Sequence, residues 1–272
     1  MTVRLERTDT EQSRNWALPE RPVFERVGVY MGDGYRQRMN DDHAARLASL
    51  TTAHLADACI RVDVPVRCAP AGTRPIAPGA RVAGRVLPAR HAGSVDVFLE
   101  AFEQAREGDV LVVDNGGRTD QACIGDLVVA EAKTAGVAGL LVWGLHRDTA
   151  DILAIGLPVF SLGALPMGPL ELSPRDSQAL VSARVGEHTV GTDDVVLADD
   201  DGAVFLPDDR VAEILNVAEG IRDVERRQAE RIRDGNTLRQ QVEFASFLEN
   251  RKRKADLTFR EHLRTVGGAI EE

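Results

Sequence analysis

The sequence has no apolar run that approaches the length of a membrane helix, and no hydrophobic signal core near its beginning. A membrane helix needs about 20 consecutive, mostly apolar residues. Residues 1–9 already include two arginines, a glutamate and an aspartate, which does not fit a secretory signal. We therefore expect a cytoplasmic protein with no membrane partner.

Cysteine is scarce, and its spacing excludes the common cysteine-based sites. The three cysteines are Cys59, Cys68 and Cys123. An odd number without metal-type spacing argues against a disulfide framework and against a zinc site, so we interpret them as reduced thiols. No partner in the sequence marks Cys123 as a nucleophile. The histidines show no metal-ligand spacing either, and His91 is interpreted as an ordinary histidine.

Basic residues are in the minority, with 33 Lys and Arg against 43 Asp and Glu and a formal net charge of −10. Nucleic acids and anionic membranes are bound through clustered Lys and Arg, so the balance argues against a nucleic-acid partner. The acidic net charge remains compatible with a local basic pocket for a small anion. At 272 residues, with 43% hydrophobic and 28% charged residues, the chain can bury a full core.

The order of the expected elements predicts an α/β protein with additions. Between residues 108 and 163, apolar strands alternate with helices, which favours a parallel layer. Short strands separated by Gly and Asp turns follow at 181–206 and predict an added antiparallel β unit. We expect an N-terminal extension at 1–42, a catalytic domain at 43–218 and a C-terminal helical extension at 219–272.

Several helices are expected around this layer. One spans about 41–59, unless the threonines at 51 and 52 cap a second helix. A long helix begins near 208 and continues to about 235, with a charge pattern typical of a solvated face; packing between subunits is the alternative. A further helix is expected at 238–253. The tail beyond it has an apolar side, so we expect it to dock.

Polar residues follow two buried strands of the predicted parallel layer. Gly125 and Asp126 open a helix, whereas Arg147 and Asp148 follow the next strand, with the twenty residues 127–146 between Asp126 and Arg147. In open α/β layers, ligands bind where strands end and loops or helices begin. Two carboxylates and an arginine brought together there could hold a divalent metal and an anionic substrate.

Five fragments, taken together, resemble one family. They are GDVLVVD at 108–114, GD at 125–126, GLHRD at 144–148, LPVF at 157–160 and GTDDVVLADDDGAVFLP at 191–207. In this order and spacing they resemble the RraA-like proteins and the 4-hydroxy-4-methyl-2-oxoglutarate (or 4-carboxy-4-hydroxy-2-oxoadipate) aldolases. The resemblance covers roughly residues 50–220.

The resemblance implies a swivelling β/β/α-type fold that assembles into homotrimers or homohexamers, with active sites at subunit boundaries. It also implies two branches. One is a divalent-metal lyase that cleaves pyruvate-type substrates and often decarboxylates oxaloacetate. The other is non-enzymatic and binds and inhibits ribonuclease E. In some members a glutamate from the C-terminal region of a neighbouring subunit reaches the site.

The side chains of Arg147 and Asp148 suit a small-molecule 2-oxo acid as substrate. The carboxylate and ketone oxygens of such an acid chelate Mg²⁺ or Mn²⁺, and Asp148 is the candidate metal ligand. Arg147 is the candidate catalytic cation, which donates to the same oxygens as negative charge develops. Arg118, in the glycine-rich loop after the first strand, is a candidate second contact for the distal half of the substrate.

The N-terminus of the predicted helix suits the substrate carboxylate. The candidate donors are the backbone N–H groups of Gly125, Asp126, Leu127 and Val128, and a glycine at 125 permits close approach. The side chain of Asp126 is the second candidate catalytic group, which orients water or relays a proton. By resemblance to the family, that water protonates the pyruvate enolate.

Each assignment has a structural alternative. Asp126 could serve only as a helix N-cap, and Gly125 only as a turn residue. Arg147 and Asp148 could form a local salt bridge. His146 adjoins this pair, and we interpret it as a structural or rim histidine because neighbouring residues in an extended loop face opposite ways.

Three functions remain open at this stage. The first is a metal-dependent aldolase that cleaves a 4-hydroxy-2-oxo acid to pyruvate and a carbonyl fragment. The second is a regulator that binds ribonuclease E. The third is a C–C hydrolase or a decarboxylase of a 2-oxo acid, since enolate stabilisation serves these reactions too. The sequence specifies the pyruvyl half of the substrate and leaves the distal half open.

Overall fold

The computed structural model describes residues 41–266, and its central feature is an eight-stranded mixed sheet. The strands, in the order in which they lie side by side, are β1 (Arg67–Cys68), β12 (Gly202–Pro207), β11 (Asp194–Asp199), β3 (Val82–Arg90), β4 (Val110–Asp114), β6 (Gly139–Trp143), β8 (Val159–Ser161) and β2 (Arg74–Pro75). The expected N-terminal extension lies outside the described residues, apart from its last two positions.

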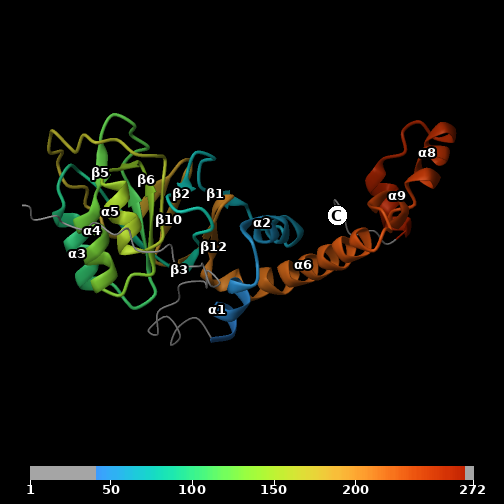
Figure 1. The fold of residues 1–272 in the computed structure, drawn as a ribbon, viewed down its shortest axis with the longest axis horizontal. Coiled ribbons are helices and arrows are strands. Elements are labelled where there is room, and N and C mark those ends of the chain that lie inside the picture. Colours follow the sequence, from blue (N-terminus) through green and yellow to red (C-terminus); the bar gives the residue numbers. More distant parts are fainter. Residues whose placement is uncertain (1–40, 267–272) are drawn as a thin grey trace, which may run out of the picture.

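Four neighbouring strands in this sheet, β3, β4, β6 and β8, run parallel. Their residues are mostly apolar and buried, as expected of strands covered on both faces. The helices α3 (Asp96–Gln104), α4 (Asp126–Thr134) and α5 (Thr149–Ile155) pack on one face (Figure 1). The parallel α/β layer predicted for residues 108–163 is therefore confirmed.

The opposite face of the sheet is covered by a hairpin of β9 (Ser182–Val185) and β10 (His188–Gly191). Alternate residues of β4 divide between the two faces: Leu111 packs with the helices and Val112 with the hairpin. β11 and β12 are also antiparallel, but they join the main sheet through β3. The added antiparallel β unit is confirmed, with its strands split between the main sheet and the hairpin.

Two helices precede the sheet, α1 (Asp41–Ala48) and α2 (Thr52–Arg61). The break between them follows from helix capping: the side chain of Thr51 accepts from the backbone N–H of His54, which closes a capping box. Of the two expectations for residues 41–59, the second helix is correct. Both helices pack against α6 (Val211–Arg233), where Arg46 Nε donates to Glu219 Oε1 at 2.8 Å.

The helix α6 begins after a 3₁₀ turn (Asp208–Arg210) and extends away from the sheet (Figure 1). Its first half is anchored by buried residues up to Ile221, and the residues beyond are mostly exposed. The solvated-face interpretation therefore fits its second half. The expected domain boundary at 218–219 falls inside this continuous helix.

Three short helices lie at the far end of α6: α7 (Leu238–Gln241), α8 (Phe244–Arg253) and α9 (Phe259–Val266) (Figure 1). The single helix expected at 238–253 is wrong, because the chain breaks at Glu243, which has a φ of 48°. The docking of the tail is confirmed for residues 258–266, and the rest of the tail lies outside the described residues. His262 Nε2 lies 2.8 Å from the carbonyl oxygen of Val242, and Leu263 is fully buried.

Between residues 41 and 266, no helix combines the length and apolar character needed to cross a membrane.

Candidate active site

The residues predicted to act together follow two short parallel strands, β5 (Ala122–Ile124) and β7 (Leu145–His146). Gly125 comes directly after β5 and Arg147 directly after β7. The backbone N–H of Arg147 donates to the carbonyl oxygen of Ile124 at 3.0 Å. The residues between them fold into α4 and β6, and the pairing of β5 with β7 brings the two polar pairs together. These strands form a separate two-stranded sheet, so the expectation that the pairs directly follow strands of the main parallel layer is wrong.

Gly125, Arg147 and Asp148 pack closely together. A Cβ added to Gly125 would overlap Asp148 Oδ2 and would lie 3.3 Å from both Cγ and Nε of Arg147. The Asp148 carboxylate therefore lies against the backbone of Gly125, and a larger residue at position 125 would require this carboxylate to shift. Arg147 Nε lies 3.4 Å from Asp148 Oδ2, and the side chains are 50% and 36% exposed. The pair is loose and open to solvent.

Asp148 adopts a left-handed backbone conformation, with φ 60° and ψ 40°. Such a conformation carries a free-energy cost for a residue with a Cβ, and it is frequent at functional sites. Asp148 is the N-cap residue of α5, yet its side chain caps nothing. Its carbonyl oxygen accepts from Ile152 at 3.0 Å. The backbone of Asp148 thus accepts a hydrogen bond from α5, and its carboxylate remains available to bind a ligand.

The N-terminus of α4 offers unpaired donors. Gly125 is the N-cap residue and no side chain caps the helix. The first helical acceptor is Gly125 itself, whose carbonyl oxygen accepts from Val129 at 3.3 Å. Over residues 41–266, no protein group accepts from the N–H groups of Asp126, Leu127 and Val128. Free N–H groups and the helix dipole make such a terminus an anion site. The N-cap interpretation of Asp126 is wrong, because Asp126 is the first helical residue.

A cavity of about 320 Å³ lies at this helix end. Gly125, Asp126, Leu127, Val128 and Arg147 all line it. Leu127 is 79% exposed, so its side chain is not packed in the core. The carboxylate of Asp148 is not part of the lining and meets the cavity wall at Gly125 and Arg147.

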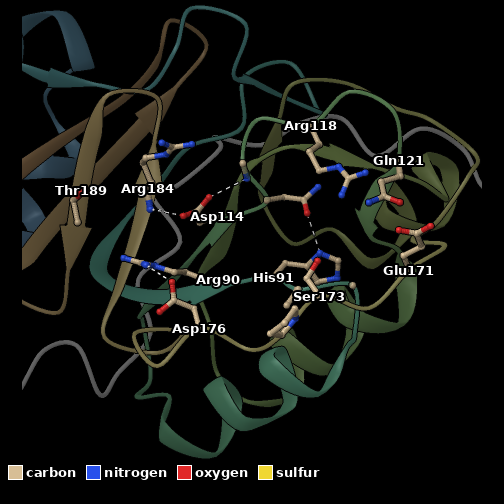
Figure 2. A pocket seen from close by; sticks show the side chains of 15 residues that line it. Arg90, His91, Asp114, Arg118, Gln121, Glu171, Ser173, Asp176, Arg184 and Thr189 are labelled. Carbon is tan, nitrogen blue, oxygen red and sulfur yellow. Dashed lines mark hydrogen bonds and ion pairs between the residues drawn. The ribbon is translucent and has the colours of Figure 1, made fainter.

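Arg118 lies in a second, adjoining cavity of about 440 Å³ (Figure 2). Its guanidinium donates to both carboxylate oxygens of Asp120, at 3.0 and 2.7 Å. Hydrogen bonding to Asp120 holds the pKa of Arg118 above its usual value. The structure therefore does not bring Arg118 together with the residues around Gly125, and places it in the adjoining cavity.

His91 is a site residue that the sequence interpretation missed. It follows β3 directly and is one of two residues that line both cavities. Its Nδ1 lies 2.9 Å from Asn115 Oδ1, and its ring stacks on Phe98 with centroids 5.3 Å apart. β3 continues to Arg90, so His91 stands at a strand end, as Gly125 and Arg147 do.

His146 and Cys123 are structural. His146 is buried, with Nδ1 2.8 Å from Ser161 Oγ and Nε2 2.9 Å from Thr149 Oγ1, and burial lowers its pKa. The structural interpretation is confirmed. Burial raises the pKa of the Cys123 thiol to about 12. A thiol in that state is a poor nucleophile at neutral pH.

The donor set near Gly125 fits a hard cation held by few protein ligands. Among residues 41–266, no group of three or more His, Cys, Asp or Glu side chains is arranged to hold a metal ion. Mg²⁺ commonly binds through one or two carboxylates, with waters and substrate oxygens completing its octahedron. Asp148, partly exposed and free of any capping role, matches that type of ligand.

Comparison with known proteins identifies relatives over much of this region. DlpA of Legionella pneumophila is 29% identical over 61% of this chain, a match that spans 28% of DlpA. A Shewanella oneidensis protein named "putative 4-hydroxy-4-methyl-2-oxoglutarate aldolase" is 35% identical over 38% of this chain and 62% of its own length. The chain thus spans less than two thirds of these relatives.

Solved structures share the fold. An uncharacterized protein from Pseudomonas syringae pv. tomato has a TM-score of 0.64 and 25% identity, over 74% of this chain and 96% of that chain. Streptomyces coelicolor RraAS2, described as an unusual member of the RNase ES inhibitor RraA protein family, has a TM-score of 0.61 and 25% identity, over 71% and 98%. The family model "RraA-like: Aldolase/RraA" matches residues 52–205. The chain therefore belongs to the RraA-like family.

Proposed function

We propose that this protein is a divalent-metal-dependent lyase that cleaves a 4-hydroxy-2-oxo acid to pyruvate and a carbonyl compound, with oxaloacetate decarboxylation as a second activity. The observation that carries the proposal is the meeting of Arg147 and Asp148 on Gly125, beside the unpaired N–H groups of α4. Relatives named as aldolases support the reaction class.

The substrate carboxylate binds at the N-terminus of α4. The N–H groups of Asp126, Leu127 and Val128 donate to it, and the helix dipole adds to the attraction. This fixes the 2-oxo group beside Arg147, which lines the same cavity. The guanidinium donates to the ketone oxygen and stabilises the negative charge that this oxygen gains as the C3–C4 bond breaks.

The remaining roles fall to the two carboxylates. Asp148 holds Mg²⁺ or Mn²⁺, which when bound supplies Lewis-acid polarisation of the 2-oxo group. Asp126 lines the cavity at the helix end, where its carboxylate orients a water and passes a proton to C3 of the pyruvate enolate.

Pyruvate release from 4-hydroxy-4-methyl-2-oxoglutarate and from oxaloacetate tests this function, with Mg²⁺, with Mn²⁺ and with a chelator. We expect metal-dependent turnover that falls about 100-fold or more in Arg147→Met and in Asp148→Asn. The matched control is Asp151→Asn, which changes an exposed carboxylate on the same helix α5. The absence of metal-dependent pyruvate release from either substrate would falsify the proposal.

A regulator of ribonuclease E is the second candidate. It rests on the shared fold with RraAS2 and with an RNA-processing inhibitor from Thermus thermophilis at 27% identity and a TM-score of 0.50. The net charge of −10 suits a basic partner. Co-purification with ribonuclease E, together with lowered ribonuclease activity, would favour this function over the lyase.

We also propose that the chain assembles into a homotrimer or homohexamer with the site near a subunit boundary. Support comes from Leu127, an apolar residue that is 79% exposed at the site in the single chain. Light scattering coupled to gel filtration measures the mass directly. A monomer at micromolar concentration would contradict this assembly.

A further inference from the structure

Two cavities of the described chain meet at His91 and Gly93. The smaller one contains the N-terminus of α4 and Arg147, which the proposed function assigns to the pyruvyl half of the substrate. The larger one opens beside it and is polar (Figure 2). Because Gly93 has no side chain, His91 provides the side chain that the two linings have in common.

The larger cavity suits the distal half of a hydroxylated or anionic substrate. The guanidinium of Arg184 lies 4.8 Å from the centre of the Trp143 ring and, among residues 41–266, forms no ion pair with a carboxylate. Arg118 is exposed in the same cavity. If C1 and C2 of the substrate bind at α4 and Arg147, the part beyond C4 would extend into this larger cavity. The C3–C4 bond, which the reaction breaks, would then lie near His91, which lines both cavities.

Three contacts hold His91 in place, two of them through its ring and one through its backbone. The ring stacks on Phe98 at an interplanar angle of 3°, and the backbone N–H donates to the carbonyl oxygen of Asp114 at 2.9 Å. Nδ1 lies 2.9 Å from Asn115 Oδ1, and the tautomer with the hydrogen on Nδ1 donates to that oxygen. In a neutral imidazole this leaves a lone pair on Nε2. No protein group in the described part of the chain occupies Nε2.

The surroundings of His91, burial above all, favour its neutral ring. Burial lowers its pKa below the ordinary 6.5, the hydrogen bond to Asn115 opposes that shift, Arg118 lowers the pKa further and Asp96 raises it. The net direction is downward, so the ring is neutral at pH 7 and can accept a proton.

We propose that His91 is the general base that accepts the proton of the substrate's C4 hydroxyl. This rests on the lyase function proposed above. The O–H bond breaks and its proton moves to Nε2. The oxygen's electron pair forms the C4=O bond of the departing carbonyl compound, and the C3–C4 electron pair becomes the C2=C3 bond of the pyruvate enolate. The π pair of the C2=O bond moves at the same time onto the ketone oxygen, which becomes the enolate oxygen. His91 returns its proton to solvent after the products leave.

The decarboxylation of oxaloacetate distinguishes a base at the C4 hydroxyl from residues that bind the pyruvyl half or stabilise the enolate. That reaction forms the same pyruvate enolate but has no hydroxyl to deprotonate. We therefore expect His91→Gln and His91→Phe to lower kcat for cleavage of 4-hydroxy-4-methyl-2-oxoglutarate by about 100-fold or more. The kcat for oxaloacetate should stay within about threefold of the wild type.

The two variants guard against a purely structural effect. The glutamine variant keeps a polar group near Asn115, whereas the phenylalanine variant keeps a ring on Phe98. His43→Gln, which changes a histidine on α1 remote from both linings, is the matched control. If the two reactions fall by the same factor in both variants, or if neither falls, His91 is not the base.

The pH profile gives an independent readout. Cleavage by the wild type should decline along an acid limb that lies below pH 6.5, because burial lowers the pKa at which His91 takes up a proton. Oxaloacetate decarboxylation should not follow that limb. If the wild type decarboxylates oxaloacetate but cleaves no 4-hydroxy-2-oxo acid, only the proposed role of His91 is overturned. A wild type with neither activity overturns the proposed function itself.

Discussion

The carboxylate of Asp148 lies against the backbone of Gly125, in the space that a Cβ at position 125 would occupy. One residue comes from the start of α4 and the other from the start of α5. The missing side chain on one helix thus sets the position of the carboxylate on the next. This contact couples the anion-binding end of α4 to the candidate metal ligand.

Gly125→Ala should therefore damage the site without unfolding the protein. The new methyl group displaces Asp148 and presses on Arg147, and displacement of a catalytic group by about 1 Å can cost 100-fold in rate. We expect pyruvate release to fall about 10- to 100-fold, with the apparent affinity for Mg²⁺ weakened. Gly220→Ala, where an added Cβ meets nothing within 4 Å, is the control. Wild-type rates in Gly125→Ala would mean that Asp148 is not held by this contact.

The left-handed backbone of Asp148 predicts that activity and stability respond differently to its replacement. Left-handed conformation costs an ordinary residue about 1–2 kcal/mol, but glycine adopts it freely. We expect Asp148→Gly, Asp148→Asn and Asp148→Ala all to abolish metal-dependent turnover. In urea unfolding, the glycine variant should be the most stable of the three, and the alanine variant about 1–2 kcal/mol less stable than it. An alanine variant as stable as the glycine variant would contradict a strained position.

The parts of the fold that could be predicted from the sequence are those with strong local patterns. The apolar runs of β4 and β6 and the helical spacing of α4 are found where expected. The meeting of Gly125 with Arg147 depends instead on the short strands β5 and β7, which were not predicted. The break at Glu243 was missed because neither glycine nor proline marks it. The carbonyl oxygen of Val242, next to the break, lies 2.8 Å from Nε2 of His262 on α9, a tertiary contact that sequence spacing does not reveal.

The rest of the site depends on tertiary contacts that no spacing reveals. His91 stands in no motif, and its role follows from stacking on Phe98 and from the position of Asn115 on the neighbouring strand end. The ion pair of Arg118 with Asp120 could have been expected from their two-residue separation. Its placement in the second cavity could not, because that depends on where the β9–β10 hairpin covers the sheet.

Arg118→Gln tests whether the larger cavity binds the distal half of the substrate. The ion pair with Asp120 is exposed, so its loss should leave stability unchanged. A lost contact to the distal group should raise KM about 5- to 20-fold with kcat nearly constant, since such binding is equal in ground and transition states. Arg175→Gln, which removes a similarly exposed pair with Glu100, should change neither. Unchanged KM in Arg118→Gln would assign Arg118 to the surface alone.

Stability should fall on the acidic side of neutrality because His146 is buried as the neutral ring. Burial lowers its pKa in the folded protein below the ordinary 6.5. Above pH 6.5 both states are neutral and the histidine has no effect. As the pH falls below 6.5 the unfolded chain binds the proton first, so the free energy of unfolding declines towards the lower folded pKa. Burial lowers the pKa of His91 too, which adds to the same decline.

Urea unfolding at pH 7.5, 6.5 and 5.5 measures this decline. His146→Asn should lower stability by about 1–3 kcal/mol at pH 7.5, since the hydrogen bonds to Ser161 and Thr149 are disturbed in a buried place. The same variant should lose less stability than the wild type between pH 6.5 and 5.5, because one of the proton-binding groups is gone. Equal slopes in the two proteins would show that His146 is already charged in the fold, or that it ionises as freely there as in the unfolded chain.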